Sequence, residues 1–92
     1  MAKKRNKLQV IYDILKVINE KKGKTKPTHI LYKSNLSHSM MEEYLAELIQ
    51  KKFIKEIKEG KNKSYVIAQR GVEYLEKYKF IQEFSNSFGL VD

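Results

Sequence analysis

The chain has 92 residues, of which 41% are hydrophobic and 33% charged, and this balance predicts one folded domain with a thin core. It contains no cysteine, which excludes disulfides, zinc fingers and thiol catalysis. No apolar run approaches the roughly 20 residues of a membrane span, and the basic start leads into an amphipathic stretch instead of a signal-peptide core. We therefore expect a cytoplasmic protein.

The net charge of +8 is unevenly distributed along the chain. Residues 1–34 hold ten Lys or Arg and two acids, residues 35–68 hold six and five, and residues 69–92 hold three and four. A positive field concentrated near the N-terminus favours phosphate as a partner. The alternative is a lysine-rich surface that only confers solubility. Seventeen of the nineteen cations are Lys, a composition also seen in proteins from hot habitats.

Residues 1–7 are a basic arm, which is either a disordered terminus or a phosphate tether made by Lys3, Lys4, Arg5 and Lys7. A helix is predicted from about Asn6 to Lys22. Its apolar residues recur at helical spacing, at Leu8, Ile11, Leu15 and Ile18, with Val10, Ile14 and Val17 beside them. We expect Gly23 at the C′ position just past the helix end.

A short helix is predicted to follow, ending near Lys33. Pro27 suits its first turn, where a missing N–H is no loss, and Thr25 or Thr28 could cap it. Ile30 and Leu31 would face inward.

A tight polar turn then leads to another helix. The turn is predicted at Lys33, Ser34 and Asn35, closed by Leu36. The helix should begin at Ser37, whose hydroxyl can accept the free N–H groups of the first turn, although Ser39 with Glu42 also fits a capping box. It should end at Lys51 or Lys52.

The second helix of this pair has two different faces. Its apolar face would pack on the first helix through Met41, Leu45, Leu48 and Ile49. The free face carries His38, Ser39, Met40 and Glu43, with Tyr44 beside them. Two short helices across a tight turn are typical of a helix-turn-helix, which lays its second helix in the DNA major groove.

Residues 53–67 have a strand-like composition. The stretches FIKEIKEG and SYVIA flank Gly60-Lys61-Asn62-Lys63, which predicts a β-hairpin with a basic tip. A hairpin directly after a helix-turn-helix is a wing, whose tip commonly lies against the DNA backbone or in the minor groove. The alternative is an ordinary hairpin with an exposed polar tip.

A final helix is predicted from Gln69 to about Ser87. It carries more apolar and aromatic surface than a terminal helix needs to cap a small domain, so we expect antiparallel pairing with a second subunit. The expected dimerisation residues are Val72, Leu75, Tyr78, Ile81, Phe84 and Phe88. The alternative is that this helix folds back on the first helix of the same chain.

The predicted fold is therefore mainly α with a small β-hairpin, a winged helix-turn-helix with a long C-terminal dimerisation helix. Three regions are expected: a basic arm at residues 1–7, the winged helix-turn-helix at residues 8–68, and the dimerisation helix at residues 69–92.

Several strings of this sequence resemble the small archaeal winged-helix DNA-binding proteins, a family that includes a dimeric chromatin-associated protein of Sulfolobus. They are T-x-I-L-Y-K-S-N-L-S at residues 28–37, Tyr44-Leu45 with Leu48-Ile49, and Gly71-Val72-Glu73-Tyr74-Leu75. The resemblance covers roughly residues 5–80 and implies a homodimer joined through the C-terminal helix, with double-stranded DNA as its partner. It places Leu36, Met41, Leu45 and Leu48 in the core, and Ser37 to Met40 and Tyr44 towards DNA.

The sequence departs from the family pattern at three places. Lys51-Lys52-Phe53 stands where relatives tend to have a glycine, and Ala68 stands where a Thr usually caps the last helix. Glu42 and Glu43 put negative charge on the DNA-facing helix, where a carboxylate repels phosphate but can also accept from cytosine N4.

Enzymatic chemistry is not expected, because a nucleophile needs a base and an orienting group nearby. The only histidines, His29 and His38, lie nine residues apart across a turn, with no clustered acids in the first helix of the pair. We expect no metal, no cofactor and no small-molecule substrate. The favoured hypothesis is a transcriptional regulator. Bases or sugars would be contacted by Ser37, His38, Ser39, Met40 and Tyr44, and phosphates by Arg5, Lys26, Lys33, Lys58, Lys61 and Lys63.

Two alternatives remain at this point. An architectural, nucleoid-associated binder with little selectivity is favoured by the near absence of Arg, which is present only as Arg5 and Arg70. A protein-interaction module without a DNA role is favoured by the acidic second helix of the pair.

Overall fold

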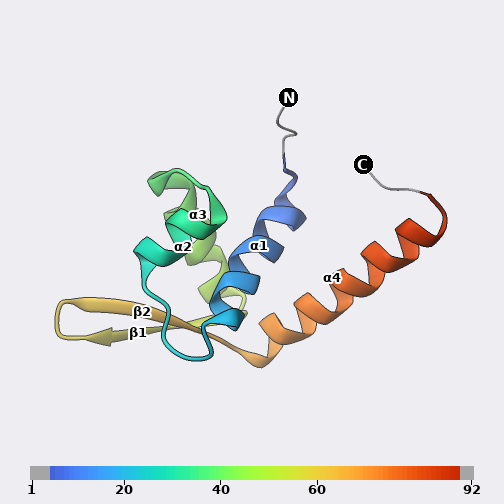
Figure 1. Cartoon of the computed structure of the whole chain (residues 1–92). Coiled ribbons are helices and arrows are strands. Elements are labelled where there is room, and N and C mark those ends of the chain that lie inside the picture. Colours follow the sequence, from blue (N-terminus) through green and yellow to red (C-terminus); the bar gives the residue numbers. More distant parts are fainter. Residues whose placement is uncertain (1–4, 90–92) are drawn as a thin grey trace.

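The computed structural model describes residues 5–89, so Lys3 and Lys4 of the predicted tether lie outside the described residues. The order of elements is α1 (Lys7–Glu20), α2 (Pro27–Ser34), α3 (His38–Gln50), β1 (Ile54–Glu59), β2 (Asn62–Ile67) and α4 (Gln69–Ser87). The three short helices gather above the base of the hairpin, whose tip projects to one side, and α4 leaves on the other side (Figure 1). The predicted winged helix-turn-helix with a long last helix is confirmed.

Helix α1 supplies most of the core. Its buried residues are Val10, Ile11, Ile14, Leu15, Val17 and Ile18. Burial of each such side chain stabilises the fold by about 1.5–3 kcal/mol. Leu8 is 56% exposed, so its predicted place in the buried stripe is wrong. Leu8 lies in the first turn of α1, at the edge of a hollow between α1, α3 and α4, and these helices do not cover it.

Both ends of α1 differ in detail from expectation. Asn6 caps its start in a capping box, in which the Asn6 side chain accepts from the Gln9 N–H and the Gln9 side chain accepts from the Asn6 N–H, each at 2.9 Å. After the C-cap Lys21, the left-handed C′ conformation is taken by Lys22 with φ +49°, and Gly23 follows with φ +152°. The prediction of Gly23 at C′ is therefore wrong by one residue.

The segment before α2 makes an isolated β-bridge to β2. Pro27 opens α2 as predicted, but the N-cap residue is Lys26, so capping by Thr25 or Thr28 is wrong. The Thr25 N–H donates to the Tyr65 carbonyl at 2.8 Å, and the Tyr65 N–H donates to the Thr25 carbonyl at 2.9 Å. This two-way bridge buries Thr25 against β2, one residue before the N-cap of α2.

The turn between α2 and α3 is shifted relative to the prediction. Lys33 and Ser34 are the last residues of α2, so their assignment to the turn is wrong. Asn35 turns the chain in the left-handed conformation, with φ +54°, because an asparagine tolerates it well. Ser37 caps α3 as predicted, and its hydroxyl accepts from the Met40 N–H at 3.2 Å.

Strands β1 and β2 pair antiparallel from Ile54↔Ile67 to Glu59↔Asn62. The loop between them has two residues, Gly60 and Lys61, with Gly60 at φ +62°. The predicted four-residue tip is therefore too long, because Asn62 and Lys63 already belong to β2. Buried Ile54 and Tyr65 anchor the base of the hairpin in the core.

Helix α3 ends without the glycine that relatives tend to have at this position. Lys52 adopts the left-handed conformation with φ +64°, and the Phe53 N–H donates to the Leu48 carbonyl at 2.9 Å. This is a Schellman ending in which a lysine takes the position that usually favours glycine. Helix α4 then begins at Gln69 after Ala68, a residue without a capping side chain.

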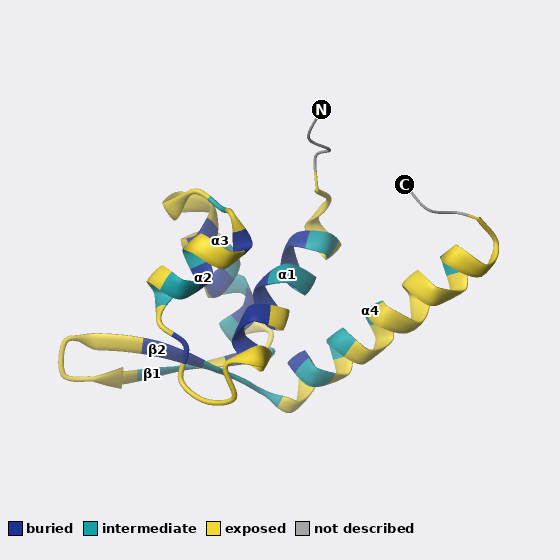
Figure 2. Ribbon diagram, viewed as in Figure 1, coloured by how far each residue is buried: buried dark blue, intermediate teal, exposed yellow. Residues whose placement is uncertain are grey.

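Helix α4 has two parts. Its first half packs on the core through Tyr74 and Leu75, and the Tyr78 ring stacks on Tyr12 with 4.5 Å between centroids. Its second half extends beyond the body and leaves apolar side chains exposed, namely Phe80, Ile81, Phe84 and Phe88 (Figure 2). Within residues 5–89, no helix has the length and apolar character needed to cross a membrane.

Candidate nucleic-acid interface

The outward face of α3 is polar and exposed. Met41, Leu45 and Leu48 point into the core. Almost directly opposite them on the helix lie four exposed residues at helical spacing: Ser39, Glu43, Ala46 and Gln50. We call these four residues the outer row. Ala46 and Gln50 were not among the predicted contacts, although their positions opposite the apolar stripe could have identified them.

The predicted base-contacting residues do not all share that face. Ser37, His38, Ser39 and Met40 are exposed at the start of α3. Tyr44 is partly buried against the core and lines a small hollow with Lys7, Glu43 and Glu47. The structure therefore places Tyr44 on the side of α3 that faces the start of α1.

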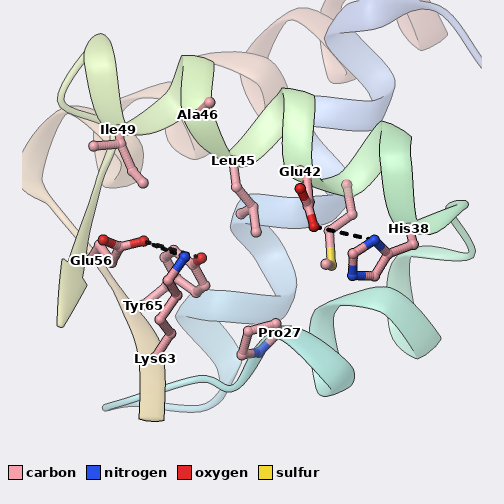
Figure 3. Close-up of a pocket in the computed structure, with 10 residues that line it drawn as sticks. Pro27, His38, Glu42, Leu45, Ala46, Ile49, Glu56, Lys63 and Tyr65 are labelled. Carbon is pink, nitrogen blue, oxygen red and sulfur yellow. Dashed lines mark hydrogen bonds and ion pairs between the residues drawn. The ribbon is translucent and has the colours of Figure 1, made fainter. Parts of the chain in front are cut away.

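A hollow of about 360 Å³ separates α3 from the wing, which we define as residues 54–67 (Figure 3). On the α3 side, the His38 Nδ1 lies 3.2 Å from a Glu42 carboxylate oxygen. On the wing side, Glu56, Lys63 and Tyr65 line the same hollow. His38 and Glu42 of α3 and Lys63 of the wing thus border one concave surface.

The lysines predicted to contact phosphate are exposed, and they lie at the outer end of the wing and at the two ends of α2. Lys58, Lys61 and Lys63 lie at the outer end of the wing. Lys26 precedes α2, next to the residue that bridges β2, and Lys33 lies in the last turn of α2. The wing lysines therefore form one group, whereas Lys26 and Lys33 lie at opposite ends of α2.

Arg5 is already engaged within the chain. Its guanidinium bonds Asp13 of α1 at 2.7 Å and donates to the Asn35 carbonyl at 3.1 Å. Arg5 therefore connects α1 to the turn between α2 and α3.

Glu47 ties the start of α1 to the end of α3. Its carboxylate lies 2.8 Å from the Lys7 ammonium and 2.9 Å from the Lys51 ammonium. The hydrogen bond from Lys7, followed by that from Lys51, lowers the pKa of Glu47, and the same bond raises the pKa of Lys7. Lys7, predicted to be part of the tether, is the first residue of α1 and an ion-pair partner of Glu47.

Binding a metal ion requires several ligating side chains that lie close together. Among residues 5–89, no group of three or more His, Asp or Glu side chains is placed to hold a metal ion. His38 lies beside Glu42, whereas His29 lies on α2.

This arrangement of helix pair, wing and terminal helix is that of a known class. The chain belongs to the winged helix-turn-helix family, whose pattern matches residues 4–86. The resemblance inferred from the sequence is thereby confirmed. No curated protein matches the chain.

Solved structures share the fold. Sso10a-2, a DNA-binding protein from Sulfolobus solfataricus, superposes with a TM-score of 0.79 at 21% identity, covering 92% of this chain and 87% of that one. The transcriptional regulator BldR from the same organism superposes with a TM-score of 0.71 at 17% identity, covering 87% of this chain and 59% of BldR. TubR of Bacillus thuringiensis serovar israelensis, bound to 24 bp of tubC, superposes with a TM-score of 0.65 at 24% identity, covering 77% of this chain and 80% of TubR. At these identities the likeness establishes the fold alone.

Proposed function

We propose that this chain is a homodimeric transcriptional regulator that places α3 in the DNA major groove and the wing on the sugar-phosphate backbone. The observation that carries the proposal is the concave surface between α3 and the wing, with exposed His38 and Glu42 on the α3 side and Lys63 on the wing side. DNA binding by Sso10a-2 and TubR supports the choice of partner. The function is binding, without catalysis or a cofactor, and its place is the cytoplasm, at the nucleoid.

The proposal assigns roles to two sets of residues. The outer row of α3, with Ser37, His38 and Met40 beside it, faces base edges or the flanking sugars, and Tyr44 stands at the side of this surface. The phosphate contacts are Lys26, Lys33, Lys58, Lys61 and Lys63, and Arg5 lies next to the helix-turn-helix turn. Phosphate contacts supply affinity, whereas base contacts supply sequence preference.

Dimerisation is proposed through α4. Val72, Leu75 and Tyr78 are partly covered within the chain, so the second half of the helix offers the apolar surface for a partner. That surface consists of Phe80, Ile81, Phe84 and Phe88, and three of these, Ile81, Phe84 and Phe88, are among the dimerisation residues expected from the sequence. A two-fold axis there would present two copies of α3 to half-sites about 34 Å apart, or a multiple of that spacing.

The test removes two wing cations and measures how DNA affinity depends on salt. For Lys61→Ala combined with Lys63→Ala, we expect weaker binding to random duplex and a log–log salt slope reduced by about two. Lys77→Ala combined with Lys79→Ala removes the same charge from α4 and should leave the slope nearly unchanged. A wing variant with the wild-type slope would contradict backbone contact by the wing.

An architectural role with low selectivity is the second candidate, and the arginines favour it. Arg is the better base reader, but both arginines are occupied within the chain. Arg5 bonds Asp13, and Arg70 donates to the Lys51 carbonyl at 3.0 Å while lying over the Phe53 ring. Comparable affinity for selected and random duplexes would favour this candidate over a regulator.

A further inference from the structure

Glu56 occupies an unusual place for a wing carboxylate. It lies on β1 directly opposite Tyr65, and its side chain is only 25% exposed. The sequence suggests a solvated, cross-strand charge at this position. Instead, the Tyr65 hydroxyl, on a buried ring, donates to a Glu56 carboxylate oxygen at 3.5 Å. The core therefore helps to fix where this negative charge lies.

Two of the wing lysines converge on that carboxylate. The register pairs Lys58 with Lys63 directly across the hairpin, two residue pairs further out than Glu56 and Tyr65. The Lys58 ammonium lies 3.8 Å from one Glu56 oxygen, and the Lys63 ammonium lies 3.8 Å from the other. Each oxygen of a single carboxylate thus faces one lysine.

The arrangement has an electrostatic reason. Like charges directly opposite each other on a hairpin repel, and a carboxylate between them offsets that repulsion. The oxygens of Glu56 therefore stand where a phosphate oxygen of DNA would be stabilised by the same two ammonium groups.

We infer that Glu56 is an internal competitor for DNA phosphate, and that it sets the affinity of the wing by holding Lys58 and Lys63 in the free protein. This inference rests on the proposed function. When DNA binds, the two ammonium groups exchange the Glu56 carboxylate for backbone phosphate, and the loss of their pairing with Glu56 offsets part of the gain. The wing consequently contributes less affinity than its number of lysines suggests.

The test is Glu56→Gln, measured against random duplex at low salt. The amide removes the charge but keeps an oxygen that can accept from Tyr65. We expect affinity to rise roughly fivefold, the factor that one unit-charge interaction at about 4 Å contributes in water. Glu76→Gln, an exposed residue of α4 remote from the wing tip, makes the same change in net charge and should raise affinity by less than twofold.

A combined variant ties the effect to the two lysines. If Glu56 acts through them, Glu56→Gln should give no gain in a background that already carries Lys58→Ala and Lys63→Ala. A gain of the same size in that background would overturn the inference, as would a Glu56→Gln affinity equal to or below that of the wild type. Thermal melts of each variant confirm that a loss of affinity does not come from unfolding.

The outcomes separate this inference from the proposed function. If the wild-type chain fails to bind duplex DNA at low salt, the proposed function fails and the inference fails with it. If the wild type binds and the wing lysine variants weaken binding, but Glu56→Gln changes nothing, only the inference is overturned.

Discussion

The Tyr74 hydroxyl donates a hydrogen bond of 2.7 Å to the Leu8 carbonyl oxygen, and so joins α4 to the first turn of α1. The Tyr74 ring lies between Phe53 and Tyr78, at 5.7 and 6.0 Å between centroids. Tyr78 in turn stacks on Tyr12. These contacts fix the direction in which α4 leaves the body and, with it, the position of the exposed second half of the helix.

This contact predicts a loss of stability in alkali. Burial, followed by the nearby Tyr78, raises the pKa of Tyr74 from 10.0 to about 12. A raised pKa means that the folded state favours the protonated hydroxyl. The stability that Tyr74 contributes is therefore complete below pH 10 and lost as the pH rises towards 12. Titration of tyrosinate absorbance in Tyr74→Phe should show one fewer tyrosine that ionises near pH 12. A titration identical to that of the wild type would contradict the raised pKa of Tyr74.

Gly71 is predicted to be intolerant of any side chain. A Cβ there would clash with the Phe53 carbonyl oxygen and would lie 2.8 Å from the Ile67 Cγ1 atom. We expect Gly71→Ala to cost about 1–3 kcal/mol through overpacking, against a helix-propensity gain of at most about 1 kcal/mol. A lower midpoint in thermal circular dichroism, with Gln69→Ala as the control at an exposed position, is the expected result. A melting temperature equal to or above that of the wild type would show that α4 can move away from the hairpin.

The proposed dimer depends on the end of α4. The rings of Phe84 and Phe88 pack on each other at 5.0 Å between centroids, and both remain exposed in the single chain. Burying two such side chains contributes several kcal/mol, so Phe84→Ser with Phe88→Ser should weaken dimerisation at least about 100-fold. Sedimentation equilibrium should then report a monomer. Tyr32→Ser, which removes another exposed aromatic ring on α2, should remain dimeric.

The outer row of α3 predicts how bases are chosen. Under the proposed function, Glu43 accepts from cytosine N4 and Gln50 pairs with adenine, each contact worth about 1–3 kcal/mol of discrimination. Selection from a randomised duplex pool should therefore lose a cytosine preference in Glu43→Gln, while Glu73→Gln on α4 keeps the wild-type preference. The same preferred sequence for both variants would mean that Glu43 does not face a base.

The sequence was sufficient for the elements whose patterns are local. The α1 stripe, the Ser37 cap and the turn at Gly60 depend on spacing within a few residues, and the structure confirms those elements. The exposure of Leu8, the bridge of Thr25 to Tyr65 and the partners of Glu56 depend on residues far apart in the chain. Pattern alone assigns Leu8 to the buried stripe, because which turn of a helix is covered depends on the elements packed against it.

The candidate site shows the same division. The start of α3 and the wing lysines could be predicted because helix-turn-helix spacing and an exposed basic tip are visible in the sequence. The number of basic residues in the sequence could not show that Arg5 forms an ion pair with Asp13 and Lys7 with Glu47. The positions of Ala46 and Gln50 on the outer row follow from the sequence, once the core face of α3 is known.

The most direct test of the central claim is a salt titration of binding to random duplex and to a selected pool, with the molecular mass determined in the same buffer. The regulator proposal predicts a dimer, a steep salt dependence and strong enrichment of one near-palindromic sequence. An equally steep dependence without enrichment would point to the architectural role. Absence of binding even at low salt would contradict DNA as the partner.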